Sequence, residues 1–154
     1  MVHDTMKCEL RIFGQRHVAV DVQALCDHLD MLVGTAVAEV IVNQHEFRLG
    51  KEDAARIRQE RPQASLRELV DSLIRAECLS GVGMVKVRIP ENSVGPVDLD
   101  ISNPCVKRTA GPYRSIVFSY WCGVFTCLLG KEFKAEYVAY DRDRDLLKCR
   151  MVPG

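Results

Sequence analysis

Tyr113-Arg-Ser-Ile-Val-Phe-Ser-Tyr-Trp-Cys-Gly-Val-Phe-Thr-Cys-Leu-Leu129 contains the most apolar run of the chain, and Gly111-Pro112 precedes it. Proline is favoured at the first position of a helix, so this segment is expected to be helical. Tyr120 and Trp121 fall on one face of that helix, and Phe118 falls on the other. A helix that is apolar on both faces is buried on both. We expect one face to lie on a sheet and the other to be covered by further helices, a ligand or a partner chain.

The segments that flank this helix have the two-residue apolar period of half-buried strands. Asn92–Pro96 forms a turn between the first two strands, which predicts an antiparallel hairpin. Lys86 and Arg88 on one strand would then lie opposite acidic residues on the other, which is a favourable cross-strand arrangement. The expected strands are residues 85–89, 97–101, 132–140 and 146–152.

The N-terminal half has the three- and four-residue apolar spacing of helices. The first apolar stripe runs from Val22 to Ile41, and Gly50 is expected to end the turn that follows it. Lys51–Glu60 is a polar helix with little to bury. Ser65–Glu68 is a capping box that opens a third helix, which ends at Gly81.

Together these elements predict one α+β domain over residues 1–154. A helical N-terminal half packs on a split antiparallel sheet of about four strands, with one long buried helix between the hairpins. Residues 1–20 form an arm or a short strand, because side chains alternate between apolar and charged over residues 7–12. Residues 21–154 form the body of the domain.

Length and charge narrow the classes of function. A chain of 154 residues suits one core. Its 21 basic and 21 acidic side chains balance, which argues against nucleic-acid binding and permits self-association, here as a homodimer. The N-terminus lacks a secretory signal and the apolar run is too short for a membrane span, so we expect a cytoplasmic protein.

The sequence contains no self-sufficient catalytic motif. It lacks a phosphate-binding or dinucleotide-binding glycine loop, a GxSxG elbow and an HExxH zinc motif. The seven cysteines are odd in number and form no CxxC pair, which favours free, buried thiols over disulfides. The chain is therefore not expected to be an enzyme.

The element order and several local patterns resemble the 4-vinyl-reductase domain family over roughly residues 20–152. The patterns are Gly81-Val-Gly83 before a strand, Tyr120-Trp-Cys-Gly-Val-Phe125 in the helix, Leu129-Gly-Lys131 before a strand, and Lys148-Cys-Arg150 in the last strand. The family includes hydrocarbon-binding proteins, a bacteriochlorophyll biosynthesis component and the sensor modules of phenol- and xylene-responsive activators. Subunits of the vesicle-tethering transport particle have a related fold.

This resemblance implies a module that binds an apolar or aromatic small molecule, such as a hydrocarbon or a tetrapyrrole-like compound. Two alternatives stay open: a non-catalytic homodimeric adaptor, and a vinyl-group reductase, for which no redox-cofactor motif is present. The apolar helix could accordingly be a pocket wall, plain core or a dimer face. The residues expected to line a ligand are Tyr113, Tyr120, Trp121, Phe125 and Tyr137.

A metal site is the less expected feature, and the cofactor remains unknown. The resemblance implies that Glu136 and Cys149 correspond to two zinc ligands of the family. Ala139 stands where the family has a further cysteine, and the Asp141–Asp145 turn replaces a Gly-Asp pair. Because a tight zinc site uses at least three protein ligands, zinc would need another ligand from elsewhere in the chain.

Overall fold

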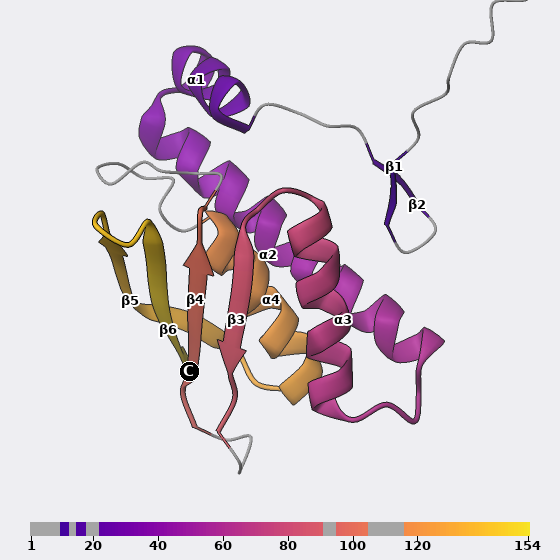
Figure 1. Cartoon of the computed structure of the whole chain (residues 1–154). Coiled ribbons are helices and arrows are strands. Elements are labelled where there is room, and N and C mark those ends of the chain that lie inside the picture. The colour runs from indigo at the N-terminus through magenta and orange to yellow at the C-terminus, as the bar shows by residue number, and fades with distance from the viewer. Residues whose placement is uncertain (1–9, 13–14, 18–21, 91–94, 105–115) are drawn as a thin grey trace, which may run out of the picture.

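A computed structural model describes residues 10–12, 15–17, 22–90, 95–104 and 116–154 (Figure 1). The order of elements is the predicted one, three helices, two strands, one helix and two strands, which confirms the α+β class. The helices are α1 (Val22–Val33), α2 (Thr35–Glu60), α3 (Leu66–Leu79) and α4 (Ile116–Leu129). The strands are β1 (Leu10–Ile12), β2 (Gln15–His17), β3 (Met84–Arg88), β4 (Val97–Ser102), β5 (Phe133–Asp141) and β6 (Leu146–Pro153).

The main sheet has four antiparallel strands in the order β3-β4-β6-β5. Each expected hairpin forms, and β4 pairs with β6 to join them into one sheet. Leu99 of β4 lies opposite both Val87 and Cys149, and all three side chains are buried. A separate hairpin of β1 and β2 stands where one short strand was expected.

Helix α4 lies between the sheet and helix α2 (Figure 1). It is buried on both faces, as its all-round apolar sequence predicted, and Phe118, Trp121, Val124 and Phe125 have no exposed surface. The cover on the far face is a helix of the same chain. That helix, α2, buries Ala38, Gly50, Ala54 and Ile57.

Two glycines let α2 and α4 approach closely. A β-carbon added at Gly50 would lie 2.0 Å from the Tyr120 carbonyl oxygen, and one added at Gly123 would lie 2.0 Å from the Phe47 carbonyl oxygen. The expectation that Gly50 ends a turn before a separate helix was wrong. Helix α2 continues through this residue, because burial against α4 offsets the low helix propensity of glycine.

The first helix also differs from the prediction. The stripe from Val22 to Ile41 is interrupted at Gly34, whose φ of 80° suits glycine and separates α1 from α2. Of the expected apolar face, Cys26 is buried and Leu29 packs beside it, together with Ala38 and Val42, which were not expected on that face. We call the exposed large apolar side chains of α1 and of the first turns of α2 the α1–α2 apolar surface. It consists of Leu25, Met31, Leu32, Val33, Val37, Val40 and Ile41, each at least 43% exposed.

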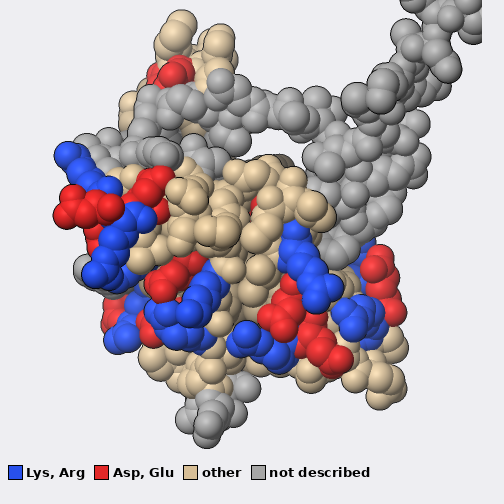
Figure 2. All heavy atoms as spheres, in the orientation of Figure 1, with Lys and Arg blue, Asp and Glu red and all other residues tan. Residues whose placement is uncertain are grey.

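Charged side chains cover the sheet face that points away from the helices (Figure 2). Arg88 donates to Asp100 at 2.7 Å, which confirms the predicted pairing between β3 and β4. Asp98 instead accepts from Arg150 at 2.8 Å, because β6 lies on the other side of β4. These pairs lie along a groove of about 370 Å³ that Glu136 and Lys148 also line.

The aromatic helix α4 as a candidate ligand site

Three aromatic rings on α4 and one on β5 form a continuous buried cluster. The Trp121 ring meets Tyr120 edge to face at 5.8 Å and 85°, and lies 6.0 Å from Phe125 at 32°. Phe125 in turn lies 5.9 Å from Phe133 of β5. Offset and edge-to-face geometries are the favoured ones for aromatic pairs. Residues 121 and 125 are four positions apart and therefore lie on the same face of α4. Strand β5 follows α4 and packs against it, which brings Phe133 next to Phe125.

Trp121 carries a buried hydrogen-bond donor without an acceptor among the described residues. Its side chain is completely buried, and within the described part of the chain its Nε1–H has no hydrogen-bond partner. Most buried polar groups are satisfied, and an isolated unsatisfied one usually marks a bound water, a ligand or a functional constraint. An acceptor atom near this N–H would remove a cost of roughly 1–3 kcal/mol.

Tyr120, by contrast, has its polar group satisfied. Its hydroxyl donates to Asp53 Oδ2 at 3.2 Å, and Asp53 also forms an ion pair with Arg56 at 3.4 Å on the same helix. Burial raises the pKa of Tyr120 far above its ordinary range, and the charges of Glu77 and Asp53 add to the effect. The hydroxyl is therefore a neutral donor at neutral pH.

Further carboxyl groups surround this hydroxyl. Glu46 of α2 and Glu77 of α3 interact electrostatically with Asp53 and Tyr120. Burial, followed by the charges of Glu46 and Asp53, raises the pKa of Glu77 to about 8. Burial also raises the pKa of Glu46. Glu77 is therefore largely protonated near neutral pH, which lowers the repulsion between α2 and α3.

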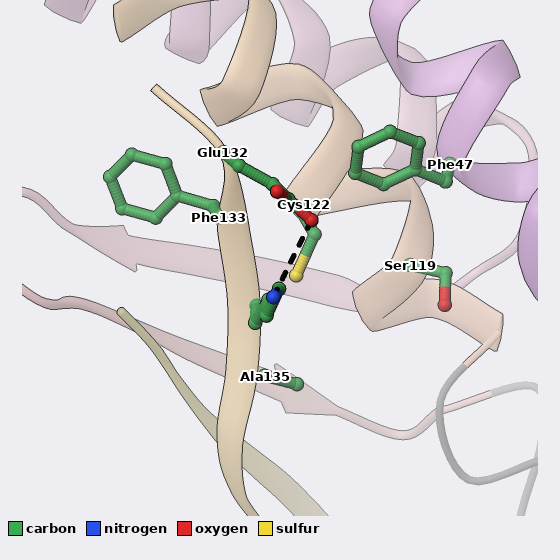
Figure 3. A pocket seen from close by; sticks show the side chains of 7 residues that line it. Phe47, Ser119, Cys122, Glu132, Phe133 and Ala135 are labelled. Carbon is green, nitrogen blue, oxygen red and sulfur yellow. Dashed lines mark ion pairs between the residues drawn. The ribbon is translucent and has the colours of Figure 1, made fainter. Parts of the chain in front are cut away.

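A groove of about 300 Å³ runs beside α4, between α2 and strand β5 (Figure 3). In Figure 3 the Phe133 ring points to the other side of β5. Glu132 and Lys134 form an ion pair, with 3.7 Å between Oε1 and Nζ. Ser119 donates to Asn43 at 3.1 Å at the α2 side. The lining residues are Phe47, Ser119, Cys122, Glu132, Phe133, Lys134 and Ala135.

The thiol of Cys122, which lines this groove, and that of the nearby Cys149 are protonated and unreactive at neutral pH. Burial raises the pKa of Cys122 to about 12, although a backbone hydrogen bond from Ala135 opposes the shift. Burial likewise raises the pKa of Cys149, and the neighbouring Cys122 adds to the effect. Since the thiolate is the reactive form, neither side chain is a nucleophile at neutral pH.

The structure brings some predicted ligand residues together. Tyr120, Trp121 and Phe125 lie in one aromatic cluster. Tyr113 lies outside the described residues. Of Tyr137 the structure describes the backbone alone, which pairs with Arg150 of β6. Whether these residues contact a ligand therefore remains a prediction.

The two predicted metal ligands differ in their surroundings. Glu136 is exposed, at a register shift between Ala135 and Tyr137, whereas Cys149 is buried on β6. Within the described ranges, no group of three or more His, Cys, Asp or Glu side chains is placed to hold a metal ion. The described residues thus provide no additional ligand for Glu136 and Cys149.

Two features of this region were not predicted from the sequence. Asp53 lies on a helix expected to be merely polar, and Phe47 lies just before a glycine that was read as a turn. The one usable signal in the sequence is Gly123, because a glycine in a buried helix lets a ligand or another helix approach closely. A second glycine, at position 50, is what identifies the helix that approaches.

Comparisons with known proteins identify a similar fold but no family. No protein-family model matches the chain, and no curated protein matches it. A similar solved structure is the phenol-responsive sensory domain of the transcription activator PoxR, crystallised with phenol. Its TM-score is 0.69 at 16% identity, covering 91% of this chain and 78% of that one. The chain therefore shares the fold of this phenol-responsive sensory domain. Membership of the 4-vinyl-reductase family remains a prediction.

In the part of the chain that the structure describes, every helix is too short or too polar to cross a bilayer.

Proposed function

We propose that this chain is a small-molecule-binding module whose ligand is a small aromatic compound with a hydrogen-bond acceptor. The observation that carries the proposal is the Trp121 Nε1–H inside an aromatic cluster, a fully buried donor that meets no acceptor among the residues the structure describes. Aromatic side chains around one oriented polar group are typical of sites for such ligands. The phenol named for the similar sensory domain belongs to this chemical class.

The same observation favours some ligands over others. A pure hydrocarbon would leave the Trp121 N–H unsatisfied, whereas a phenol or an aromatic ketone would accept from it. The charged groups that interact with Tyr120 are the carboxyl groups of Glu77, Asp53 and Glu46. An ionised ligand would therefore lack a counter-charge, and we expect the site to reject carboxylates. A tetrapyrrole needs far more room than one ring, so we favour the smaller aromatic compound.

Isothermal titration with phenol, benzene and benzoate tests the proposal. We expect phenol to bind, benzene to bind more weakly and benzoate to be excluded. Trp121→Phe keeps most of the ring volume but removes the donor, and should weaken phenol binding at least about tenfold. The matched control is Ala135→Leu, which fills the groove beside β5 without touching Trp121.

The two variants also locate the ligand. If Ala135→Leu abolishes binding and Trp121→Phe does not, the ligand lies in the groove and the assignment to Trp121 is wrong. A crystal structure provides a second check. An ordered water on Nε1 that phenol does not displace would contradict the proposal.

We also propose that the module is a homodimer that associates through the α1–α2 apolar surface. Seven exposed apolar side chains lie within residues 25–41. Contiguous apolar surface of this kind usually marks an interaction site. A homodimer of this kind would be compatible with an adaptor as well as with a ligand-binding module. The titration with phenol distinguishes these two roles, because only the ligand-binding module is expected to bind phenol.

A further inference from the structure

The contacts around Trp121 continue from the ring to a charged residue on another helix. The Trp121 ring rests edge to face against Tyr120, and the Tyr120 hydroxyl donates to Asp53. We propose that Asp53 is a positioning residue, which holds Tyr120 and thereby sets the direction in which the Trp121 N–H points. The positioning of Trp121 does not depend on the proposed function, whereas its expected effect on ligand affinity rests on it.

The helix crossing brings Asp53 to the right place. Helices α2 and α4 come closest where Gly50 meets the Tyr120 carbonyl oxygen. Asp53 follows Gly50 by three residues, which is nearly one turn of the same helix face. Its carboxylate therefore lies level with the side chain of the residue whose backbone Gly50 contacts. The 3.2 Å hydrogen bond is the result.

The bond from Tyr120 to Asp53 has a well-defined direction. The side chain of Asp53 is 16% exposed and is itself fixed by Arg56 at 3.4 Å. Hydrogen bonds to an ionised acceptor are stronger than neutral ones, and the shielding of this carboxylate from solvent strengthens the bond further. Of the two rings on α4 that contact Trp121, Phe125 has no polar group. Only the Tyr120 ring can be held by a directional bond.

The function of this bond differs from ordinary core stability. Phenylalanine at position 120 would fill nearly the same volume and would lack only the hydroxyl. A donor that must meet a ligand acceptor needs a defined direction, because a hydrogen bond weakens steeply when it is misaligned. Residues that hold a binding side chain in place commonly affect affinity without touching the ligand.

The experiment uses the single tryptophan of the chain as the reporter. Near-ultraviolet circular dichroism and fluorescence emission of Trp121 are measured for the wild type, Asp53→Ala, Asp53→Asn and Tyr120→Phe. Phenol affinity is measured by titration as a second readout. Asp71→Asn is the matched control, because Asp71 is a half-exposed carboxylate with an ion pair to Arg67 on the neighbouring helix α3.

We expect Asp53→Ala and Tyr120→Phe to change the tryptophan bands and to weaken phenol binding by about five- to tenfold. Asp53→Asn keeps an acceptor oxygen and should restore both readouts to within about twofold of the wild type. The double variant should equal either single variant, because both remove the same bond. Asp71→Asn should leave the tryptophan bands unchanged.

The proposal is overturned if the folded Asp53→Ala and Tyr120→Phe variants keep the wild-type tryptophan bands. It is equally overturned if Asp53→Asn fails to restore the bands that Asp53→Ala loses. Should Asp53→Ala not fold, Tyr120→Phe carries the test, since it removes one oxygen atom. If the wild type does not bind phenol, the proposed function fails, and the tryptophan bands still decide whether Asp53 positions Trp121.

Discussion

Gly50 of α2 and Gly123 of α4 face each other's helix so closely that neither position can hold a β-carbon. The added atom would lie 2.0 Å from the Tyr120 carbonyl oxygen in one case and 2.0 Å from the Phe47 carbonyl oxygen in the other. Both obstacles are backbone atoms, which cannot rotate out of the way. The relationship is reciprocal, because each glycine meets the backbone three residues before the other.

Alanine at either glycine should therefore force the two helices apart. We expect Gly50→Ala and Gly123→Ala each to lower the free energy of unfolding by about 3 kcal/mol or more, at the upper end of overpacking effects. Urea denaturation measures the change. Gly81→Ala is the control, since Gly81 has open space around it and a φ of 82° as its only restriction. That control should cost only about 1 kcal/mol, and equal losses at all three positions would contradict the close approach.

Glu77 should make stability depend on pH. Its pKa is raised from 4.5 to about 8 in the folded protein. Between these two values the folded state binds more protons than the unfolded state, so stability falls as pH rises through this window. Glu77→Gln removes the effect, and the variant should melt roughly 5 °C or more above the wild type at pH 8.5.

Thermal melts from pH 4.5 to 9 measure this difference. The variant and the wild type should be nearly equal at the acid end and should diverge as the pH increases. Glu60→Gln, at an exposed position on α2, is the control and should follow the wild type throughout. If the melting temperatures of Glu77→Gln and the wild type changed with pH in the same way, ionisation of Glu77 would not destabilise the folded protein, and the prediction would be wrong.

The cysteines should react in order of their exposure. Cys78 is exposed, whereas Cys122 and Cys149 are buried, and burial raises the pKa of both buried thiols. Iodoacetamide at pH 7.5 should modify Cys78 within minutes and the two buried thiols only after unfolding. Peptide mass spectrometry with and without urea measures this order. Rapid native labelling of Cys122 would show that the groove beside β5 opens in solution.

The α1–α2 apolar surface should govern association. Leu32 is 77% exposed on this surface, and Leu79 is 73% exposed at the end of α3. We expect Leu32→Glu to convert the dimer to a monomer, because a charge cannot be buried in an apolar interface without a partner. Light scattering after size exclusion measures the mass. Leu79→Glu is the matched control and should remain a dimer.

Much of the fold could be predicted from the sequence because the period of apolar residues is a local property. The hairpins and the two-sided burial of α4 follow from that period, and the capping box at Ser65 forms as expected. The boundary at Gly34 and the continuity through Gly50 could not be predicted. Helix α2 continues through Gly50 because this glycine packs against residues about 70 positions away, whereas a β-carbon at Gly34 would meet open space.

The candidate site was less accessible to prediction for a similar reason. Aromatic side chains on α4 could be identified from their spacing, and three of them do meet. Asp53 could not be identified, because its role depends on the crossing of α2 over α4. An unsatisfied Trp121 N–H is visible only when every neighbouring acceptor has been placed.

Helix α2 runs without a break for 26 residues, from the exposed surface at Val37 to the end of α4, where Arg58 donates to the Leu128 carbonyl oxygen at 2.7 Å. Midway it touches α4 backbone to backbone at Gly50. The atoms of α4 nearest to Gly50 are backbone atoms, which cannot rotate away. A small shift of α4 on ligand binding would therefore displace the backbone of α2 directly. Because α2 is one continuous helix, the same displacement would move the α1–α2 apolar surface at its other end.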